Sequence, residues 1–272
     1  MSALLHKQLT YTIRGTLFDI HNQLGPMLPE KAYQKAVVIG LEKAGINCEI
    51  EKRFDVYYEG INVGWYFVDV WLEQAPILLE LKVAPQIEPI HKAQALSYLK
   101  ITNADLALLV NFGEARLTVE RLPNFLRDKQ AIWSWDASRP LPDGHIKPQL
   151  TNHILEALHH VHFTLGPGYF HHIYRRATRI ALRKREIYHR YIKKIPIFYH
   201  GEHLIDQDVR LISIESCILV ATVAVQNITA AMKQQLKARL KALNHQLAIL
   251  ANFNGTRLDI VTIGTTDGER NG

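Results

Sequence analysis

Apolar residues recur at two spacings along this chain, and the change from one spacing to the other predicts the order of its elements. Over residues 4–23 they recur every three to four positions, as on the buried face of a helix, until Gly25-Pro26 ends the pattern. A second helical segment begins at Pro29-Glu30, runs to about residue 44 and stops at Gly45. The chain is therefore predicted to begin with two helices.

Five segments after these helices have the Val, Ile and aromatic content of strands, and a third helix interrupts them. The first three follow one another closely enough to form a meander, and the fourth is the most apolar. The predicted strands are 50–58, 63–72, 77–83, 104–111 and 116–121, and the helix is 87–102. The order ααβββαββ favours an α/β fold, in which helices flank a mixed sheet with its most apolar strands at the centre.

This succession occurs twice. Residues 8–117 match residues 149–258 at a constant offset of 141, without a gap. Identical anchors include Leu24-Gly25-Pro26 with Leu165-Gly166-Pro167, and Asn111-Phe112 with Asn252-Phe253. Because this period is far longer than the unit of a solenoid, the chain is predicted to contain a duplicated domain. We call residues 1–121 the first copy and residues 149–272 the second copy.

Residues 122–148 have no counterpart in the repeat and are predicted to link the two domains. Their prolines and turn formers are Pro123, Pro140, Asp143-Gly144, Pro142 and Pro148. Trp133 and Trp135 indicate that part of this linker packs on a domain. The polar tail at 262–272 is predicted to be frayed.

Composition favours a soluble globular protein. Of the 272 residues, 47% are apolar and 21% are charged, which suits two domains of ordinary size. The two cysteines, Cys48 and Cys217, lie at non-equivalent positions, so neither a disulfide framework nor a cysteine-based zinc site is expected. The first residues lack the apolar run of a signal peptide, and no apolar stretch is long enough to span a membrane. We expect a cytoplasmic location.

The net charge of +6 is unevenly distributed. Residues 1–121 hold 12 Lys and Arg against 14 Asp and Glu, which leaves 20 against 12 for the remainder. The two parts therefore carry −2 and +8. A positive excess confined to one domain favours a polyanionic partner. A solvated basic surface would have the same composition and is the alternative.

Three charged residues interrupt predicted strands that are otherwise apolar. Glu80 and Lys82 share one face of strand 77–83, and Asp69 lies on the preceding strand. Two carboxylates brought together repel each other unless a divalent cation lies between them, and ligation by oxygen alone suits Mg²⁺ or Mn²⁺. Lys82 could help to deprotonate a metal-bound water or stabilise charge on a phosphate. An ordinary buried salt bridge is the alternative.

The helix that follows presents further candidates. Its spacing places His91, Gln94 and Tyr98 on one face, which could overlook the carboxylates. Packing for Tyr98, and a hydrogen bond from helix to strand for Gln94, are equally open. Glu30, at the start of the second helix, is a candidate for a further ligand or an outer carboxylate.

In these motifs the first copy resembles the GxxExxY family of the PD-(D/E)XK nuclease superfamily. The matching stretches follow the family's order and cover essentially all of residues 8–121. They are Gly25-Pro26 leading to Glu30-Lys31-Ala32-Tyr33, then Phe67-Val68-Asp69, Leu79-Glu80-Leu81-Lys82, Gln94 to Lys100, and Leu108 to Gly113. One departure is Met27, which stands where the family name has its glycine and puts the geometry of the helix entry in question.

The resemblance implies two tandem restriction-endonuclease-like domains of the α/β class, each a mixed sheet flanked by helices, that form an intramolecular pseudo-dimer. It also implies roles for single residues. Asp69 and Glu80 would be metal ligands, Lys82 the catalytic lysine, Gln94 and Tyr98 the helix motif bordering the site, and Glu30 an accessory acid.

In the second copy most of these residues are replaced. At the offset of 141, Asp69 becomes Arg210, Glu80 becomes Ala221, Lys82 becomes Val223, Tyr98 becomes Arg239 and Glu30 becomes His171, while Gln94 persists as Gln235. Without the two carboxylates the same metal site cannot form, so the second copy is predicted to be a degenerate domain. Gly168 and Tyr174 keep the other two residues of the family name, and the scaffold is expected to persist.

The second copy also holds a basic segment, 175–194, with nine Lys and Arg against one acid. We predict a helix here, with Arg176, Arg179 and Arg183 along one face, Lys184 beside them, and Tyr188 and Tyr191 nearby. Arginines with aromatics suit phosphate backbones, and His91 of the first copy is assigned to nucleic-acid binding as well. A solvated face is the alternative. His159, His160, His171 and His172 lack the carboxylate or cysteine that would favour a metal cluster.

The leading hypothesis is a nuclease that uses Mg²⁺ or Mn²⁺. The first copy would hydrolyse phosphodiester bonds of nucleic acid, with DNA favoured over RNA, and the second copy would grip the substrate. The protein would act as a monomeric pseudo-dimer or a higher homo-oligomer, without a membrane partner. The alternative is a non-catalytic nucleic-acid-binding or adaptor protein whose nuclease fold is a relic.

Overall fold

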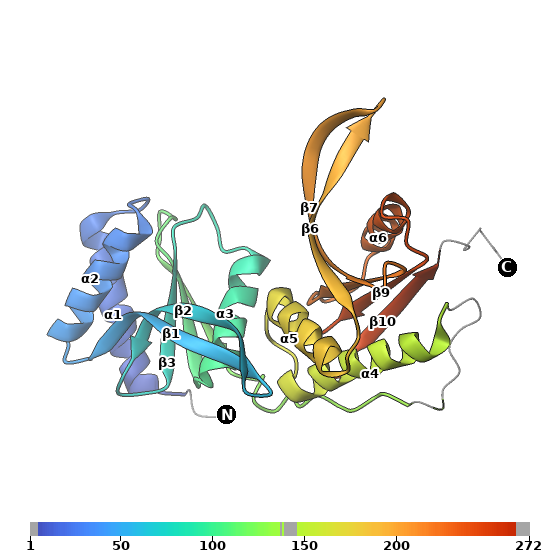
Figure 1. The fold of residues 1–272 in the computed structure, drawn as a ribbon. Coiled ribbons are helices and arrows are strands. Elements are labelled where there is room, and N and C mark those ends of the chain that lie inside the picture. The colour runs from blue at the N-terminus through green and yellow to red at the C-terminus, as the bar shows by residue number, and fades with distance from the viewer. Residues whose placement is uncertain (1–4, 137, 139–145, 265–272) are drawn as a thin grey trace. The chain divides into compact units, whose positions relative to one another are not determined.

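The computed structural model describes residues 5–136, 138 and 146–264, and within them each half of the chain has the same order of elements (Figure 1). The first half contains α1 (Lys7–Leu24), α2 (Glu30–Lys43), β1 (Cys48–Tyr58), β2 (Ile61–Leu72), β3 (Ile77–Lys82), α3 (Pro89–Thr102), β4 (Leu106–Asn111) and β5 (Thr118–Pro123). The second half contains α4 (Pro148–Leu165), α5 (His171–Lys184), β6 (His189–Tyr199), β7 (Glu202–Ile214), β8 (Ile218–Val223), α6 (Ala230–Ala242), β9 (Leu247–Asn252) and β10 (Asp259–Gly264). Each element of the second half begins 141 residues after its counterpart, as the sequence repeat predicts.

Each half forms a five-stranded mixed sheet. The strand orders are β1-β2-β3-β4-β5 and β10-β9-β8-β7-β6. In the first sheet, β3 and β4 are parallel because α3 crosses between them, whereas β3 pairs with β2, and β4 with β5, in antiparallel fashion. The second sheet repeats these directions. The predicted α/β class, with a mixed sheet whose most apolar strands lie inside it, is confirmed.

Side-chain alternation along β3 separates an apolar face from a charged face. Ile77, Leu79 and Leu81 pack in one core cluster with residues of α1 and α2. Glu80 and Lys82 therefore project from the opposite face of the sheet, the face that α3 covers. The sequence pattern thus places the two charged residues of β3 beneath the helix that carries Gln94 and Tyr98.

Two buried polar contacts are repeated atom for atom in both halves. The Asn111 side chain donates to the carbonyl of Ala84 at 2.9 Å and accepts from its amide at 3.0 Å, and Asn252 makes the same pair of bonds with Val225 at 2.9 and 3.1 Å. These asparagines satisfy the backbone where the chain leaves β3 and β8, which explains why the repeat keeps them. Duplication has preserved contacts as well as the order of elements.

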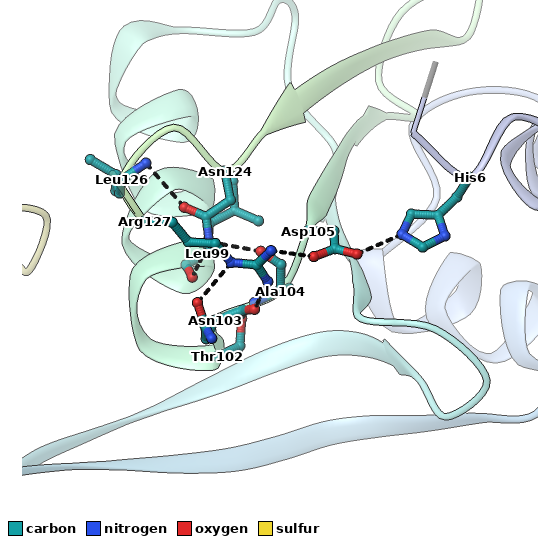
Figure 2. Close-up of polar contacts among 9 residues, drawn as sticks. All are labelled: His6, Leu99, Thr102, Asn103, Ala104, Asp105, Asn124, Leu126 and Arg127. Carbon is teal, nitrogen blue, oxygen red and sulfur yellow. Dashed lines mark hydrogen bonds and ion pairs between the residues drawn. The ribbon is translucent and has the colours of Figure 1, made fainter. Parts of the chain in front are cut away.

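A polar network closes the first domain beyond β5 (Figure 2). Arg127 donates to Asp105 at 2.5 Å and to the side chain of Asn103 at 2.8 Å, and His6 contacts the other Asp105 oxygen at 2.7 Å. Asn124 donates to the carbonyls of Leu99 and Ala104, at 3.1 and 2.7 Å. These bonds fix the segment after β5 against the end of α3.

The predicted linker is shorter than the sequence suggests. Pro123 is the last residue of β5, and Pro148 is the first residue of α4, where its missing amide costs no hydrogen bond. Trp133 packs edge-on against Phe163 at 5.7 Å, so part of the linker packs on α4 as predicted. The remaining linker signals, Pro140, Pro142 and Asp143-Gly144, lie outside the described residues.

The tail prediction needs a correction. Residues 262–264 belong to β10, which pairs with β9 in the second sheet, and residues 265–272 lie outside the described part of the chain. The described residues divide into two units, one made of 5–57 with 64–128 and the other of 58–63 with 129–264. Among them, no helix is long and apolar enough to cross a membrane.

Candidate active site

The candidate site of the first copy lies where β2 and β3 separate. The paired positions are Trp71 with Leu78 and Val70 with Leu79, and the ladder stops there. One step further on, the amide of Leu81 donates to the Asp69 carboxylate at 2.8 Å instead of to a backbone carbonyl. The fork between the strands therefore brings the side chain of Asp69 to Glu80, and it orients one Asp69 oxygen.

Glu80 is the most constrained residue of this fork. Its side chain has no exposed surface, one carboxylate oxygen accepts from the Lys82 ammonium at 2.5 Å, and the other oxygen, Oε2, has no hydrogen-bond partner. Desolvation, reinforced by the neighbouring charge of Asp69, raises the pKa of Glu80 to about 8, although Lys82 acts in the opposite direction. The fork thus holds a buried carboxyl group whose second oxygen accepts no hydrogen bond.

The surrounding ionisable groups respond to one another. Burial raises the pKa of Asp69, against the stabilising effects of the Leu81 amide, of Lys82 and of a hydrogen bond from the Glu80 carboxyl group. Desolvation lowers the pKa of Lys82, but the attraction of Glu80, Asp69 and Glu30 outweighs it and the net shift is upward. Lys82 therefore stays an ammonium group at neutral pH. Glu30, at the exposed start of α2, has its pKa raised by partial desolvation, and both Lys82 and Asp69 act on it.

Helix α3 contributes Gln94 and Tyr98, as its spacing predicts. Gln94 donates to the Tyr98 hydroxyl at 2.9 Å, and the Tyr98 ring packs edge-on against Tyr66 at 5.7 Å between centroids. Burial raises the pKa of Tyr98, and so do the nearby carboxyl groups of Glu80 and Asp69. Glu30, Asp69, Glu80, Lys82, Gln94 and Tyr98 are thus brought together in the first copy.

The donor set of the fork fits a hard divalent cation. Among the described residues, no group of three or more His, Cys, Asp or Glu side chains is arranged to hold a metal ion. Mg²⁺, however, is often held by only one or two carboxylates, with waters and substrate phosphates completing its shell. Asp69 and Glu80 meet that requirement, and the unpartnered Oε2 of Glu80 is an oxygen for which a cation would replace the missing donor.

One neighbour of the fork was not anticipated from the sequence. Gln34, which is 7% exposed on α2, donates to the carbonyl of Asp69 at 3.1 Å and so holds the backbone of β2 in place. At the offset of 141 this glutamine becomes Arg175, also 7% exposed. Comparison of the two copies could have identified Gln34, because this polar residue of α2 is replaced by an arginine in the copy that lacks the acids.

The tyrosine of the GxxExxY pattern is structural in both copies. Tyr33 donates to the carbonyl of Gly25 at 2.5 Å, accepts from the amide of Leu28 at 3.2 Å and stacks on Phe112 at 4.2 Å. Tyr174 makes the equivalent contacts, with its hydroxyl donating to Gly166 at 2.7 Å. Tyr33 fixes the loop before α2, and Tyr174 fixes the loop before α5. Their hydroxyl groups are used in these loop contacts and not in the fork.

The missing glycine of the first copy has a conformational effect. Gly168 has φ = 113°, and Met27, at the equivalent position, has φ = 68°. Both values are positive, so the position favours glycine, and Met27 holds a backbone conformation that costs a residue with a Cβ atom. The glycine of the pattern therefore shapes the entry into the helix.

The second copy lacks the acids, and its β-sheet register also differs. Val70 faces Leu79 in the first copy, but Ile212, and not the equivalent Leu211, faces Val220 in the second. A β-bulge between Ile192 and Lys194 of β6 takes up the extra residue of β7, and Arg210 lies in it with φ = 53°. Arg210 is the counterpart of Asp69 in sequence, but the slip of one residue moves it relative to β8.

The predicted basic helix is wrong in extent. Helix α5 ends at Lys184, and β6 begins at His189, so segment 175–194 spans a helix, a turn and the start of a strand. The counterpart segment in the first copy likewise spans α2 and β1. The strand predicted there from residue 50 implies, at the offset of 141, a strand from residue 191 in the second copy. Tyr188 lies in the turn and Tyr191 on β6.

The four basic residues predicted on α5 differ in their surroundings. Arg176 and Arg183 are exposed, and Arg176 also donates to the carbonyl of Val63 at 3.2 Å. Arg179 is half-buried, with its guanidinium 5.0 Å from the centre of the Tyr191 ring. Lys184 is exposed and forms an ion pair with Glu59.

His91 has a local role at the start of α3. Its Nδ1 atom accepts from the amide of Glu88 at 3.1 Å, and the Glu88 side chain completes a reciprocal capping box. The contact orients the ring at the first turn of the helix. Its predicted role in nucleic-acid binding stays a prediction.

Comparisons with known proteins agree with the fold. No curated protein matches the chain significantly. A solved structure titled "Crystal structure of SSO0001" is 18% identical over 43% of this chain and 62% of that chain, with a TM-score of 0.25, so this chain spans less than two thirds of its length and the likeness carries no argument. The family model of the PD-(D/E)XK nuclease superfamily matches residues 7–122 and, again, residues 148–262. With both copies matched, this chain belongs to the PD-(D/E)XK nuclease superfamily.

Proposed function

We propose that the protein is a metal-dependent nuclease in which the first copy hydrolyses phosphodiester bonds and the second copy binds nucleic acid without cutting it. The observation that carries this proposal is the fork between β2 and β3. There a fully buried Glu80 with an unpartnered oxygen lies beside Asp69 and Lys82. Such an arrangement is costly for stability alone, and perturbed carboxyl groups of this kind cluster at functional sites.

Asp69 and Glu80 would hold the cation, Mg²⁺ or Mn²⁺. When bound there, it would supply Lewis-acid stabilisation of the negative charge on the phosphate and a more acidic water nucleophile. Neighbouring residues of the chain would hold the ligand Asp69 in position. The Leu81 amide fixes Asp69, and the Gln34 side chain fixes the backbone carbonyl of the same residue.

Lys82 would neutralise charge that develops on the phosphate oxygens. Its ammonium is held at 2.5 Å from Glu80, and its pKa is raised, so it is charged throughout the physiological range. Release of Glu80 towards a cation would leave the Lys82 ammonium free to face the substrate. Gln94 and Tyr98, linked by their 2.9 Å hydrogen bond, would border the phosphate from the side of α3.

The basic surface of α5 would supply most of the binding energy for nucleic acid. Arg176 and Arg183 are both exposed on this helix, and residues 122–272 carry a charge of +8 against −2 for the first copy. Contacts to phosphates are independent of sequence and depend strongly on salt. DNA is the favoured partner, within an intramolecular pseudo-dimer.

The test is a cleavage panel with single- and double-stranded DNA and RNA, in the presence of Mg²⁺, Mn²⁺ or EDTA. Asp69→Asn, Glu80→Gln and Lys82→Met should each abolish metal-dependent cleavage while circular dichroism and the melting temperature remain those of a folded protein. Asp55→Asn is the matched control, because Asp55 is a carboxylate of β1 that pairs with Arg53 away from the fork. Cleavage retained in all three variants would overturn the assignment.

A second candidate is a non-catalytic nucleic-acid-binding or adaptor protein. The 2.5 Å contact between Lys82 and Glu80 favours it, because an ion pair alone could retain both residues. The two candidates differ in metal binding. A working site binds Mn²⁺ through Asp69 and Glu80, whereas a relic closed by its own lysine does not.

A further inference from the structure

A pocket of about 250 Å³ occupies, in the second copy, the place that the fork occupies in the first. It opens between β7 and β8, with one wall from α5 and another from α6. Its lining includes His171, Arg175, Arg210, Ala221, Val223 and Arg239. Five of these six are the sequence counterparts of Glu30, Asp69, Glu80, Lys82 and Tyr98, and Arg175 is the counterpart of Gln34. Loss of the acids has therefore left a basic pocket.

Arg175 is the buried cation of this pocket. It is 7% exposed, and within the described part of the chain no carboxylate forms an ion pair with it. Its compensation comes from Tyr191, whose ring centre lies 5.6 Å from the guanidinium carbon and whose side chain also hydrogen-bonds with Arg175. Desolvation lowers the pKa of Arg175, Tyr191 acts in the opposite direction, and the neighbouring Arg210 adds to the lowering. A buried guanidinium without a counterion is expensive unless an anion completes its surroundings.

Arg239 presents a second unsatisfied donor. Its Nε atom is buried and has no hydrogen-bond partner, and desolvation lowers the pKa of the side chain. Because Arg239 replaces Tyr98 on the helix that covers the pocket, this donor comes from the wall opposite Arg175. Two guanidinium groups from two helices thus line one small cavity.

Arg210 adds a third cation at the bulge of β7. It holds a left-handed backbone conformation, φ = 53°, which is costly for a residue with a Cβ atom. Its contact with Asp208 is long, 3.4 Å, and both side chains are more than half exposed. Asp208 is the one carboxylate among the described lining residues, so the pocket keeps a large positive excess.

We propose that this pocket binds the phosphate group of a phosphomonoester, either free or at the end of a nucleic-acid strand. Guanidinium groups bind phosphate through paired hydrogen bonds, and a monoester carries close to two negative charges at neutral pH. The volume, below the roughly 300 to 1,000 Å³ of drug-sized pockets, suits a single such group. Ala221, in place of Glu80, and Arg210, in place of Asp69, remove the two carboxylates that would repel it.

The proposal does not depend on cleavage by the first copy. It assigns to the degenerate site a ligand of its own, and it is tested in EDTA, where metal-dependent cleavage cannot occur. Failure of the nuclease assignment would leave it intact, and its own failure would leave the first copy's site untouched.

The test is isothermal titration calorimetry of the full chain with four probes. They are inorganic phosphate, a nucleoside 5′-monophosphate, and one oligonucleotide with either a 5′-phosphate or a 5′-hydroxyl. Arg239→Gln should weaken inorganic phosphate binding by about tenfold or more, the loss expected for a charged hydrogen bond. Arg175→Gln, which restores the residue of the first copy, should do the same. Arg257→Gln, at an exposed position between β9 and β10 and outside the pocket, is the matched control and should leave phosphate binding unchanged.

The two oligonucleotides identify the source of the phosphate. Tighter binding of the 5′-phosphorylated strand, lost in Arg239→Gln, assigns the pocket to strand ends. Equal binding of both strands, with a mononucleotide bound in the pocket, assigns it to free phosphomonoesters. No binding of inorganic phosphate or mononucleotide, or binding that Arg239→Gln leaves unchanged while the variant melts like the parent protein, would overturn the proposal. Arg239 is only partly buried, so this variant is expected to fold even where Arg175→Gln does not.

Discussion

Binding of a divalent cation to the fork should release a proton from Glu80. The carboxyl group has a pKa of about 8, so about nine in ten molecules carry this proton at pH 7. A cation that takes the Oε2 atom as ligand must displace it. Well below pH 8, affinity should therefore fall about tenfold for each pH unit, which is about 1.4 kcal/mol per unit. Between pH 8 and pH 6 it should fall about fiftyfold, because half of the molecules already carry the proton at pH 8.

Calorimetric titration with Mn²⁺ measures this directly. Repeating the titration in two buffers of different ionisation enthalpy counts the protons released, with about 0.9 expected at pH 7 and almost none at pH 9.5. Glu80→Gln removes the titrating group without changing its shape, so any residual binding should be weak and independent of pH. Asp55→Asn should retain the proton release of the parent protein.

Release of fewer than about 0.2 protons at pH 7 with tight binding would refute the reasoning, because Glu80 would then already be ionised by Lys82. An affinity that keeps rising above pH 9 would instead assign the proton to Lys82, whose pKa is raised from an ordinary value of 10.5. No binding at all would favour the relic with a closed salt bridge.

The same shift sets the sign of the pH dependence of stability. The folded-state pKa of Glu80 lies above its ordinary value of 4.5, so the folded protein binds the proton more tightly than the unfolded chain does. Stability of the metal-free protein should therefore fall as pH rises from about 4.5 to about 8. Asp69 and Glu30, whose pKa values are also raised, change the stability with the same sign. The raised pKa of Lys82 affects stability only above pH 10.5, its ordinary pKa. Glu80→Gln should lack this loss.

The geometry of the two copies leads to three further predictions. Met27→Gly should raise the free energy of unfolding of the first domain by roughly 0.5 to 1 kcal/mol, since it relieves the positive φ; calorimetry checks it, and a lower melting temperature would contradict it. Tyr33→Phe should cost about 1 to 3 kcal/mol in a chemical denaturation curve, because the Leu28 amide and the Gly25 carbonyl lose their shared partner. Charge reversal at Arg176 and Arg183 should weaken nucleic-acid binding and lower the salt slope by about 0.9 for each phosphate that the protein no longer neutralises; an unchanged slope would return this face of α5 to a solvated surface.

Much of the first copy's site could be predicted because its signals are local. Alternation along β3 already puts Glu80 and Lys82 on one face of that strand. The helical spacing of Gln94 and Tyr98 puts these two residues on one face of α3. The crossover from β3 to β4 then leaves little choice about which helix covers the charged face. The position of Gln34 could not be predicted, since its bond to Asp69 joins residues 35 apart on different elements.

The second copy shows where local signals fail. Segment 175–194 has the charge pattern of one basic helix, but tertiary pairing of His189 onward with β7 turns its end into a strand. Helix propensity is a weak preference, and the hydrogen bonds of the sheet override it. The burial of Arg175 follows from that packing and not from its sequence neighbourhood.

The sequence by itself determined the duplication, the order of elements in each copy and the identity of the acids that the second copy lost, because each is read from spacing along one chain. Tertiary structure alone decided that β2 and β3 separate at Asp69, that Glu80 keeps an unpartnered oxygen, and that a bulge at Arg210 shifts β7 by one residue. These features depend on which groups of distant strands and helices meet, and on which buried donors and acceptors are left without a partner when they do.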